Sequence, residues 1–377
     1  MDFELTREQR MIRDTVREFA EAEIAPHASE WDKTEHFARD VFAQMGELGF
    51  LGIPFPEEYG GSGGDMVSYC LAVEEVGRAC GGTGLSFEAH VSLACTPIFL
   101  YGTEEQKQKY LVPLASGKEL GSFGLTEPGA GSDAGGTRTT AVAEGDEWVI
   151  TGTKIFNTNG GVASTVVLTA VTDPVNHGIS AFIVPTDTPG FSVSKAYDKL
   201  GMRASNTVEL ILDGVRVPTE NLLGPLNAGF KQFLTTLDGG RVAISGLAIG
   251  IARAAFETAL NYAKTRVQFG QSISKFQAIQ HKLADMAMHI DLAQNAMLKA
   301  AWLCDNGKPY TLEASYSKLF SSEMCTRTCE QAVQILGGYG YMREYSVERN
   351  YRDAKLIEIG EGTSEVQRLV IARQLGC

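Results

Sequence analysis

The 377-residue chain lacks the patterns that build a disulfide scaffold or a zinc site. It has seven cysteines, an odd number, and no Cys-x-x-Cys pair. Its six histidines form no His-Glu-x-x-His pattern, the spacing that places two zinc ligands on one helical face. We therefore expect free thiols in a reducing compartment and no metal site.

Positive charge is also scarce. Lysine and arginine total 33 against 46 aspartates and glutamates, which gives a formal net charge of −13. Because such a surface repels phosphate backbones, we expect no nucleic-acid partner. With 44% apolar and 21% charged residues, the composition is that of a folded globular protein rather than a disordered one.

Long apolar segments are missing too. We find no run of about 18 apolar residues, so we expect no membrane-spanning segment. The first ten residues carry acidic Asp2, Glu4 and Glu8 and no apolar core, which argues against a signal or transit peptide.

Proline and strand-forming residues divide the chain into three parts. Residues 1–119 show mostly helical periodicity, with Thr6 as a candidate cap of the first helix. Residues 120–225 hold six of the twelve prolines and short Val/Ile/Thr runs at 148–151, 165–169, 181–184 and 208–212, typical of a β-sandwich or barrel. Residues 226–377 contain one proline and a long amphipathic stripe from Leu283 to Ala301. This order disfavours a doubly wound α/β fold.

The segment 129–134 fits the loose dinucleotide fingerprint Gly-x-Gly-x-x-Ala. That fingerprint binds a pyrophosphate only when a strand precedes it and a helix follows. Here Pro128 precedes it, and the next residues, Gly-Gly-Thr-Arg-Thr-Thr, favour a loop or strand. We therefore predict a tight loop that presents backbone N–H groups and the Ser132 hydroxyl.

Two further segments allow two interpretations each. In 154–161, Phe156 and Thr158 are two apart on a predicted strand, so they form either an ordinary strand end or an aromatic wall with a hydroxyl donor on one face. In 334–340, the glycines form either a helix cap followed by a loop or a backbone that a ligand approaches closely.

Taken together, five ordered motifs resemble the acyl-CoA dehydrogenase family over nearly the whole chain. They are Phe-Gly-Leu-Thr-Glu-Pro-Gly-Ala-Gly-Ser-Asp at 123–133, Lys-Ile-Phe-Asn-Thr-Asn-Gly-Gly at 154–161, Arg-Val-Gln-Phe-Gly at 266–270, Gln-Ile-Leu-Gly-Gly at 334–338 and Glu-Gly-Thr-Ser-Glu at 361–365. The resemblance implies an α+β multidomain fold with a helical N-terminal domain (1–119), a central β-barrel or sandwich (120–225) and a C-terminal four-helix bundle (226–377). It also implies FAD and a homotetramer, a dimer of dimers.

The resemblance also assigns expected roles to single residues. Phe156 packs on the flavin, Thr158 donates to flavin N5, and Ser132 contacts both cofactor and thioester. The full cofactor-binding set is Phe123, Leu125, Thr126, Gly131, Ser132, Phe156, Thr158, Arg266, Gln268, Phe269, Gln277, Gln334, Gly337, Gly338, Thr363 and Glu365. The substrate-binding set is Ser132, Asp238, Arg241 and Gly362.

The implied reaction converts an acyl-CoA thioester into its trans-2-enoyl product. Glu361 matches the family's catalytic glutamate, which removes the α-proton while the β-hydrogen leaves as hydride to flavin N5. Ile357 and Ile359 suggest a dry setting, in which burial would raise the carboxyl pKa toward the working pH. Relatives that carry the base elsewhere have it at the place of Gly240, which cannot act as a base.

Two departures bear on the substrate. Gly360 stands where many relatives have tyrosine, so we expect a pocket that tolerates a differently shaped acyl chain. No lysine or arginine occurs between Arg78 and Lys107, around the segment expected to line the acyl pocket, so a dicarboxylyl substrate is disfavoured. We expect Glu88, in that segment, to be solvated or to cap a helix.

Alternatives remain at this point. An acyl-CoA oxidase or another flavoenzyme on the same fold is the second enzyme hypothesis, and a flavin-free binding protein is a third. For the dehydrogenase, the resemblance implies electron-transfer flavoprotein as acceptor and a location in the bacterial cytoplasm or, after processing, the mitochondrial matrix.

Overall fold

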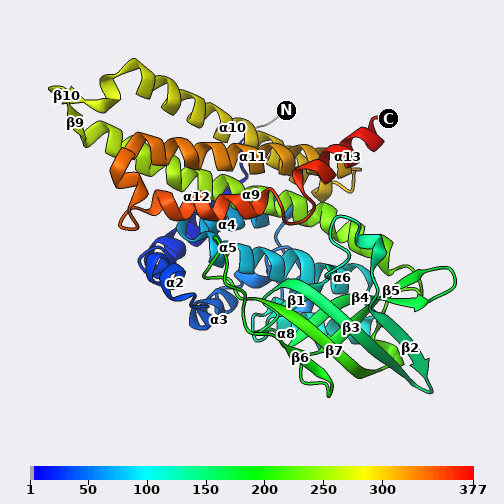
Figure 1. Ribbon diagram of the computed structural model, residues 1–377. Coiled ribbons are helices and arrows are strands. Elements are labelled where there is room, and N and C mark those ends of the chain that lie inside the picture. The colour runs from blue at the N-terminus through cyan, green and yellow to red at the C-terminus, as the bar shows by residue number, and fades with distance from the viewer. Residues whose placement is uncertain (1–3) are drawn as a thin grey trace.

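The computed structural model describes residues 4–377, so Asp2, used above in the argument about a leader, lies outside it. Helices from both ends of the chain pack together, and the sheet formed by the middle part lies beside them (Figure 1). The expected helical, β, helical order is therefore confirmed.

The first part of the chain is helical. Thr6 begins α1 with a capping box, because its hydroxyl accepts from the Gln9 N–H at 3.2 Å and the Gln9 side chain accepts from the Thr6 N–H at 2.9 Å. A π-helical segment, Ala89–Cys95, joins two of the later helices. The helices are α1 (Arg7–Phe19), α2 (Ala28–Thr34), α3 (Arg39–Glu47), α4 (Met66–Ala79), α5 (Gly81–Glu88), α6 (Thr96–Tyr101), α7 (Glu104–Gln106) and α8 (Val112–Ala115).

The middle part forms one hydrogen-bonded eight-stranded sheet. Its order is β6-β7-β3-β2-β4-β5-β8, and β1 pairs with β4 in parallel. All four Val/Ile/Thr runs predicted as strands lie in strands. The strands are β1 (Gly121–Gly124), β2 (Thr140–Glu144), β3 (Glu147–Thr158), β4 (Thr165–Asp173), β5 (Gly178–Pro185), β6 (Phe191–Val193), β7 (Thr207–Pro218) and β8 (Leu222–Leu223).

The glycine-rich loop after β1 is no dinucleotide fingerprint. Within residues 129–139 the only helical piece is the three-residue turn Ala134–Gly136, and the chain then enters β2. The predicted loop is therefore confirmed. No helix N-terminus stands there to hold a pyrophosphate.

The last part is a helical bundle with a small hairpin at one end. The stripe predicted in 283–301 lies on α10, where Leu283, Met286, Ile290 and Met297 are buried, although Ala287 of the same stripe is exposed. The elements are α9 (Gly229–Thr265), β9 (Val267–Gln268), β10 (Gln271–Ser272), α10 (Gln277–Asp305), α11 (Thr311–Leu336), α12 (Ser346–Ile357) and α13 (Ser364–Gln374).

Helix α9 is long and apolar enough, by length and composition alone, to cross a membrane. The sequence of α9 contains no unbroken run of about 18 apolar residues, so the sequence alone did not mark it. However, 72% of its most apolar window is buried inside the protein. Helices α4, α10, α11 and α12 pack around it, as expected of the central helix of a bundle.

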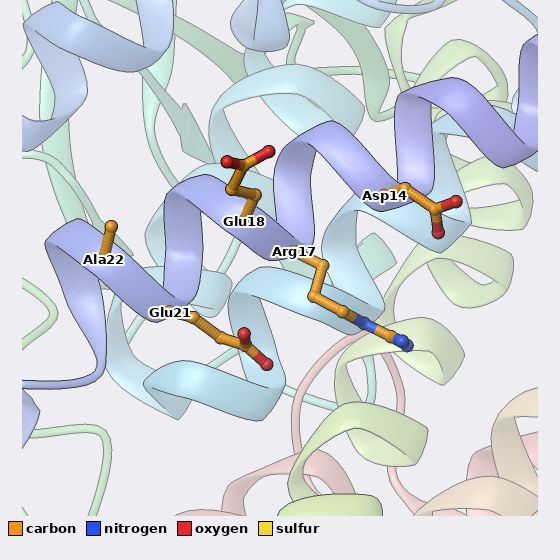
Figure 2. Close-up of a pocket in the computed structure, with 5 residues that line it drawn as sticks. All are labelled: Asp14, Arg17, Glu18, Glu21 and Ala22. Carbon is orange, nitrogen blue, oxygen red and sulfur yellow. The ribbon is translucent and has the colours of Figure 1, made fainter.

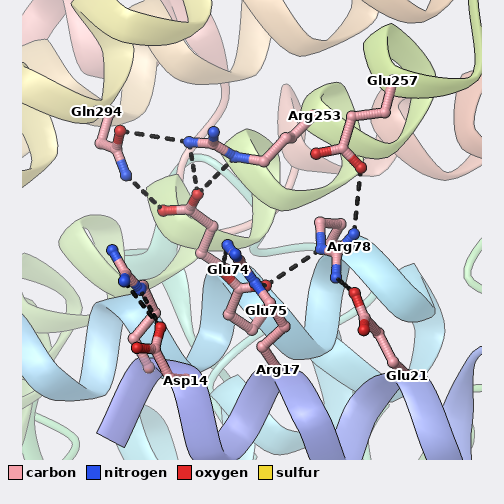
Figure 3. Close-up of polar contacts among 10 residues, drawn as sticks. Asp14, Arg17, Glu21, Glu74, Glu75, Arg78, Arg253, Glu257 and Gln294 are labelled. Carbon is pink, nitrogen blue, oxygen red and sulfur yellow. Dashed lines mark hydrogen bonds and ion pairs between the residues drawn. The ribbon is translucent and has the colours of Figure 1, made fainter. Parts of the chain in front are cut away.

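Buried charges join the N-terminal helices to this bundle (Figure 3). On α4, the Glu75 carboxylate accepts from Arg17 of α1 at 3.0 Å and from Arg78 at 3.1 Å. The neighbouring Glu74 accepts from Arg253 of α9 at 2.9 Å. Since Glu74 and Glu75 are both buried, each depends on its arginine partners, and the pairs fix α4 between α1 and α9.

Candidate active site

The loop between α12 and α13 places Glu361 against the middle of the bundle. Glu361 has φ +55°, a left-handed conformation that non-glycine residues seldom adopt, and Gly362 follows with φ +94°. Other parts of the bundle hold the loop in this shape. Lys318 of α11 donates to the Gly362 carbonyl at 2.6 Å, and Gln367 of α13 donates to the Glu361 carbonyl at 3.1 Å. Strain supported in this way is typical of functional sites.

The Glu361 carboxyl group lies directly on Gly240 of α9. A Cβ atom built on Gly240 would be 2.4 Å from Glu361 Oε2, closer than such atoms approach in proteins. Positions 240 and 361 therefore converge on one point. A carboxyl group carried by either position would therefore reach the same place in the structure. A side chain at position 240 would also clash with the Glu361 carboxyl group.

We predict that Gly240→Ala lowers kcat by about 100-fold, because the added methyl displaces the Glu361 carboxyl group by roughly 1 Å. The matched control is Gly239→Ala on the same helix, where the nearest atom to a new Cβ is the Tyr310 hydroxyl at 3.7 Å. Both variants gain the same helix propensity, so steady-state kinetics side by side isolate the steric effect. Equal activities would show that the carboxyl position is unimportant.

Burial determines the acidity of Glu361. It raises the pKa of the Glu361 carboxyl to about 7, although a hydrogen bond with Glu88 and the cations Lys318 and Arg241 oppose the rise. Ile357 is buried as expected, but Ile359 is 55% exposed and contributes no dryness. A carboxyl group with a pKa near neutrality can accept a proton and release it again at physiological pH.

Glu88 contradicts its expected role. It was predicted to be solvated or to cap a helix, yet its side chain is fully buried at the end of α5 and interacts with the Glu361 carboxyl group. The pKa of Glu88 is raised well above its usual range by burial and by that neighbour. The prediction failed because helical position alone does not show that the π-helical segment 89–95 and α9 close over this residue.

Asp238 and Arg241 lie beside this point on α9. They form an ion pair at 2.7 Å, and Asp238 also accepts from the Thr311 hydroxyl at 2.7 Å. Arg241 is buried, and its Nε lies 3.5 Å from the Glu361 carbonyl oxygen. Arg241 therefore contacts the loop that carries Glu361, and Asp238 holds Arg241 there.

The residues expected to face the flavin lie on strands β1 and β3 and in the loop that follows β1. Phe123 stacks on Phe233 of α9 with ring centroids 4.2 Å apart, and the Thr126 carbonyl accepts from Ile155 at 2.8 Å. Leu125, Thr126 and Thr158 are half-buried, and Gly131 and Ser132 are exposed.

A bulge in β3 breaks the expected alternation at Phe156. The pairing with β7 shifts between Lys154 and Asn157, and Phe156 takes φ +58° with 64% of the residue exposed. The regular two-residue alternation of a strand therefore does not predict which way the Phe156 ring points. The bulge instead presents the ring outward, 5.5 Å from Tyr197.

A buried ion pair anchors the loop that carries Thr126 and Ser132. The Glu127 carboxylate accepts from the fully buried Lys154 at 2.7 Å and from the Thr139 N–H at 3.0 Å. Burial alone would raise the pKa of Glu127, but Lys154 and the hydrogen bonds lower it to about 2. Burial in turn lowers the pKa of Lys154 to about 8 despite the attraction of Glu127.

A second group of predicted residues lies at the far end of the bundle. Arg266, Gln268, Phe269 and Gly338 line a cavity of about 700 Å³. The Arg266 guanidinium lies 5.5 Å from the centre of the Tyr339 ring. Predicted residues that are exposed near it are Gln277, Gln334 and Gly337.

The two groups do not meet within one chain. Phe123 of the first group stacks on Phe233 of α9. An α-helix rises about 1.5 Å per residue, so Arg266 lies roughly 50 Å along α9 from that contact. Phe269, at the tip of the hairpin, is 94% exposed.

The remaining predicted residues, Thr363 and Glu365, begin α13. The Thr363 hydroxyl accepts from the Val366 N–H at 3.2 Å and caps the helix, whereas Glu365 is exposed. Their expected FAD contacts stay predictions.

A separate surface hollow lies on α1 (Figure 2). Asp14, Arg17, Glu18, Glu21 and Ala22 line it, and all five belong to the N-terminal helices. The Arg17 guanidinium is already paired with Glu75. This hollow holds none of the catalytic candidates.

Three features of the site were not predicted from the sequence. Glu88 is the only acidic residue in 80–103, a signal that could have marked it as buried. Lys318 lies mid-helix among small residues and looks like a surface lysine in sequence. The steric role of Gly240 depends on two segments about 120 residues apart and left no local signal.

The chain was compared with known proteins. Family models for acyl-CoA dehydrogenase match it in three parts: the N-terminal domain at 6–118, the middle domain at 122–215 and the C-terminal domain at 227–376. It is 65% identical to a probable acyl-CoA dehydrogenase of Bacillus subtilis and 52% identical to a short-chain specific acyl-CoA dehydrogenase of Clostridium acetobutylicum, over 100% of all chains concerned. The solved structure of butyryl-CoA dehydrogenase from Megasphaera elsdenii superposes with a TM-score of 0.98 at 46% identity, over 100% of both chains.

Proposed function

Because the chain belongs to the acyl-CoA dehydrogenase family, we propose that it oxidises a short acyl-CoA to the trans-2-enoyl-CoA with Glu361 as the catalytic base. The observation that carries this is the buried carboxyl group of Glu361, held on a strained loop with a pKa raised to about 7. A solvated loop glutamate, the alternative for this residue, would keep its usual acidity.

The residues present fit FAD. Phe156 presents an exposed aromatic ring from a bulge with a left-handed backbone conformation, and the cavity at Arg266 combines a cation with aromatic rings. Leu125, Thr126, Ser132, Phe156 and Thr158 would hold the flavin ring. When bound, FAD supplies the hydride acceptor for the reaction.

The chain's own groups activate and orient the thioester. Glu361 takes the α-proton, and the acidity of that proton rises when the thioester carbonyl accepts hydrogen bonds in a dry site. The Glu361 N–H takes no acceptor in the hydrogen bonds of residues 4–377, so it is free to donate to that carbonyl. Arg241 and Lys318 donate to the Glu361 and Gly362 carbonyls, which restrains the loop that carries this N–H.

The separation of the two predicted cofactor groups favours a homo-oligomer. Since Arg266 lies roughly 50 Å along α9 from Phe233, on which Phe123 of the first group stacks, one extended cofactor does not reach both groups of one chain. The exposed Phe269 and the cavity beside it would hold the adenine-diphosphate half of a cofactor whose flavin lies in a second copy. We propose the homotetramer that the resemblance implied.

Gly360 supports a choice among acyl chains. The nearest atom to a Cβ built there is the Leu356 carbonyl oxygen at 3.6 Å, so the position has room. We predict that Gly360→Tyr lowers kcat/KM for branched acyl-CoAs by about tenfold relative to straight ones, because the ring fills space near the α-carbon. A competition assay with butyryl-CoA and a branched acyl-CoA gives the ratio of the two kcat/KM values for the wild type and for Gly360→Tyr. The same ratio in both proteins would refute a role of Gly360 in the choice of acyl chain.

A kinetic panel of C4 to C16 straight, branched and aryl acyl-CoAs tests the proposed activity. A dye acceptor reports dehydrogenation, and an oxygen electrode reports the oxidase alternative. The proposal expects dye reduction with short chains and negligible oxygen uptake. Purified protein that is colourless and takes up no FAD would instead favour the flavin-free binding protein.

Membership of the family also suggests the electron acceptor and the cellular compartment. We propose electron-transfer flavoprotein as the physiological acceptor, in the cytoplasm of a bacterium or the matrix of a mitochondrion. A solved structure from work on the electron transferring flavoprotein of Acidaminococcus fermentans is similar to this chain, with a TM-score of 0.98 at 51% identity over 100% of this chain and 99% of that one.

A further inference from the structure

Two carboxyl groups face each other in the buried site. Glu88, at the end of α5, is fully buried, and neither of its oxygens has a hydrogen-bond partner of good geometry in the described chain. Among the described residues, the Ser92 hydroxyl is the one polar group besides Glu361 that acts on it at hydrogen-bond range. The neighbour of Glu88 is the Glu361 carboxyl, whose Oε2 also lacks such a partner. Ionised carboxylates only accept hydrogen bonds, so this contact requires a proton on one of them.

The surrounding groups do not neutralise the pair directly. From α4, the Tyr69 hydroxyl donates to the Glu88 backbone carbonyl at 3.0 Å and contacts Ser92 at 2.9 Å, and the buried Cys70 thiol lies nearby. From α9, Arg241 is paired with Asp238. From α11, Lys318 donates to the Gly362 carbonyl. Both cations therefore act on Glu361 from a distance, and neither forms a salt bridge with the two carboxyls.

The unequal surroundings decide which carboxyl holds the proton. Glu361 has Lys318 and Arg241 within electrostatic range, which favours its ionised form. No cation of the described chain is among the groups that act on Glu88, and only the Ser92 hydroxyl favours its ionised form. Burial and the neighbouring carboxylate outweigh that hydroxyl and keep Glu88 neutral.

We propose that Glu88 is a positioning residue for the catalytic base: as a neutral carboxylic acid it donates a hydrogen bond to the Glu361 carboxylate, so the pair holds one proton before turnover and two after it. This inference rests on the proposed role of Glu361. The α-proton of the substrate bonds to Glu361, the electrons of the broken C–H bond stay on the substrate, and the pair later returns one proton to water. The shared hydrogen bond also aims the Glu361 oxygen.

Kinetics of two variants at Glu88 test the proposal. Glu88→Gln keeps a hydrogen-bond donor, whereas Glu88→Leu keeps the approximate volume without one. We expect the acid limb of the kcat/KM profile to stay at the wild-type position in Glu88→Gln and to move up by about one pH unit in Glu88→Leu. At pH 6 the leucine variant would then be about tenfold slower than the glutamine variant, and at high pH the two would converge. Superimposed profiles of all three proteins would overturn the proposal.

An infrared measurement tests the pair without activity. At about pH 8.5 ordinary carboxyls are ionised. We expect wild type to retain the C=O stretch of a protonated carboxyl, Glu361→Gln to keep it and Glu88→Gln to lose it. A wild-type spectrum without this band, or a band unchanged in Glu88→Gln, would overturn the proposal. If the protein proved inactive on acyl-CoAs, the proposed function would fail while this spectrum still decided the state of the pair. Melting curves confirm that each variant folds.

Discussion

Replacing Glu361 by glutamine is expected to lower kcat by about 10⁴-fold, at the upper end of what a positioned base contributes. Glutamine has nearly the same shape and keeps the backbone N–H, but its amide does not take a proton. The fold and the uptake of FAD should therefore survive, and only the chemical step should fail.

The matched control for this variant is Glu358→Gln in the same loop. The Glu358 side chain is mostly buried and pairs with Lys355 at 2.7 Å. It acts on Lys318 through charge alone and forms no hydrogen bond with the Glu361 carboxyl in the described residues. We expect near wild-type kcat from it in the dye-coupled assay. Comparable activity in Glu361→Gln and Glu358→Gln would remove Glu361 from the mechanism.

The pH dependence of this reaction follows from the sign of the shift. A base works when ionised, and burial raises the pKa of Glu361 to about 7. Activity should therefore rise tenfold per pH unit below about 7 and level off above it. A solvated glutamate would give its plateau already near pH 5.

Replacing Lys154 by methionine is expected to destabilise the protein by about 3–5 kcal/mol. The substitution leaves the Glu127 carboxylate buried without its ammonium partner, since Lys154 is fully buried and lies 2.7 Å from it. The remaining hydrogen bonds to Glu127, from Thr139 and others, place the loss toward the lower end of that range. Urea unfolding followed by circular dichroism measures the change.

Two control variants show whether the loss of stability comes from the buried ion pair. Arg216→Met removes an ion pair that is half exposed, with Glu144 at 2.7 Å, and should change stability by less than about 1 kcal/mol. The double variant Lys154→Met with Glu127→Gln should recover part of the loss, because no unpaired charge remains. If the single variant at Lys154 were as stable as Arg216→Met, the pair would not anchor the loop.

Local patterns predicted the elements of the fold well. The capping box at Thr6 and the four strand runs depend on neighbouring residues, and they lie where the sequence places them. The stripe on α10 was predicted on the same basis and failed only at Ala287, where the partner helices do not cover the full width of the stripe.

The candidate site was harder to predict because its geometry is tertiary. The motif around Glu361 marked the residue, but the contact with Gly240 and the burial of Glu88 arise where α5, α9 and the loop after α12 meet. The same limit applies at Phe156, where a one-residue bulge in β3 overrides the alternation of a regular strand. Glu88, a single carboxylate in an apolar run, carried a local signal of burial, and it was interpreted wrongly as a solvated or capping residue.

The most direct test of the account follows the α-proton itself. A 3-thia acyl-CoA has sulfur at the β-position and no hydrogen there to leave as hydride, so proton removal is observed alone. With FAD-loaded protein in heavy water, the account predicts rapid entry of deuterium at the α-carbon with wild type, and exchange at the rate of buffer alone with Glu361→Gln. Exchange that is equally fast in both proteins would contradict it.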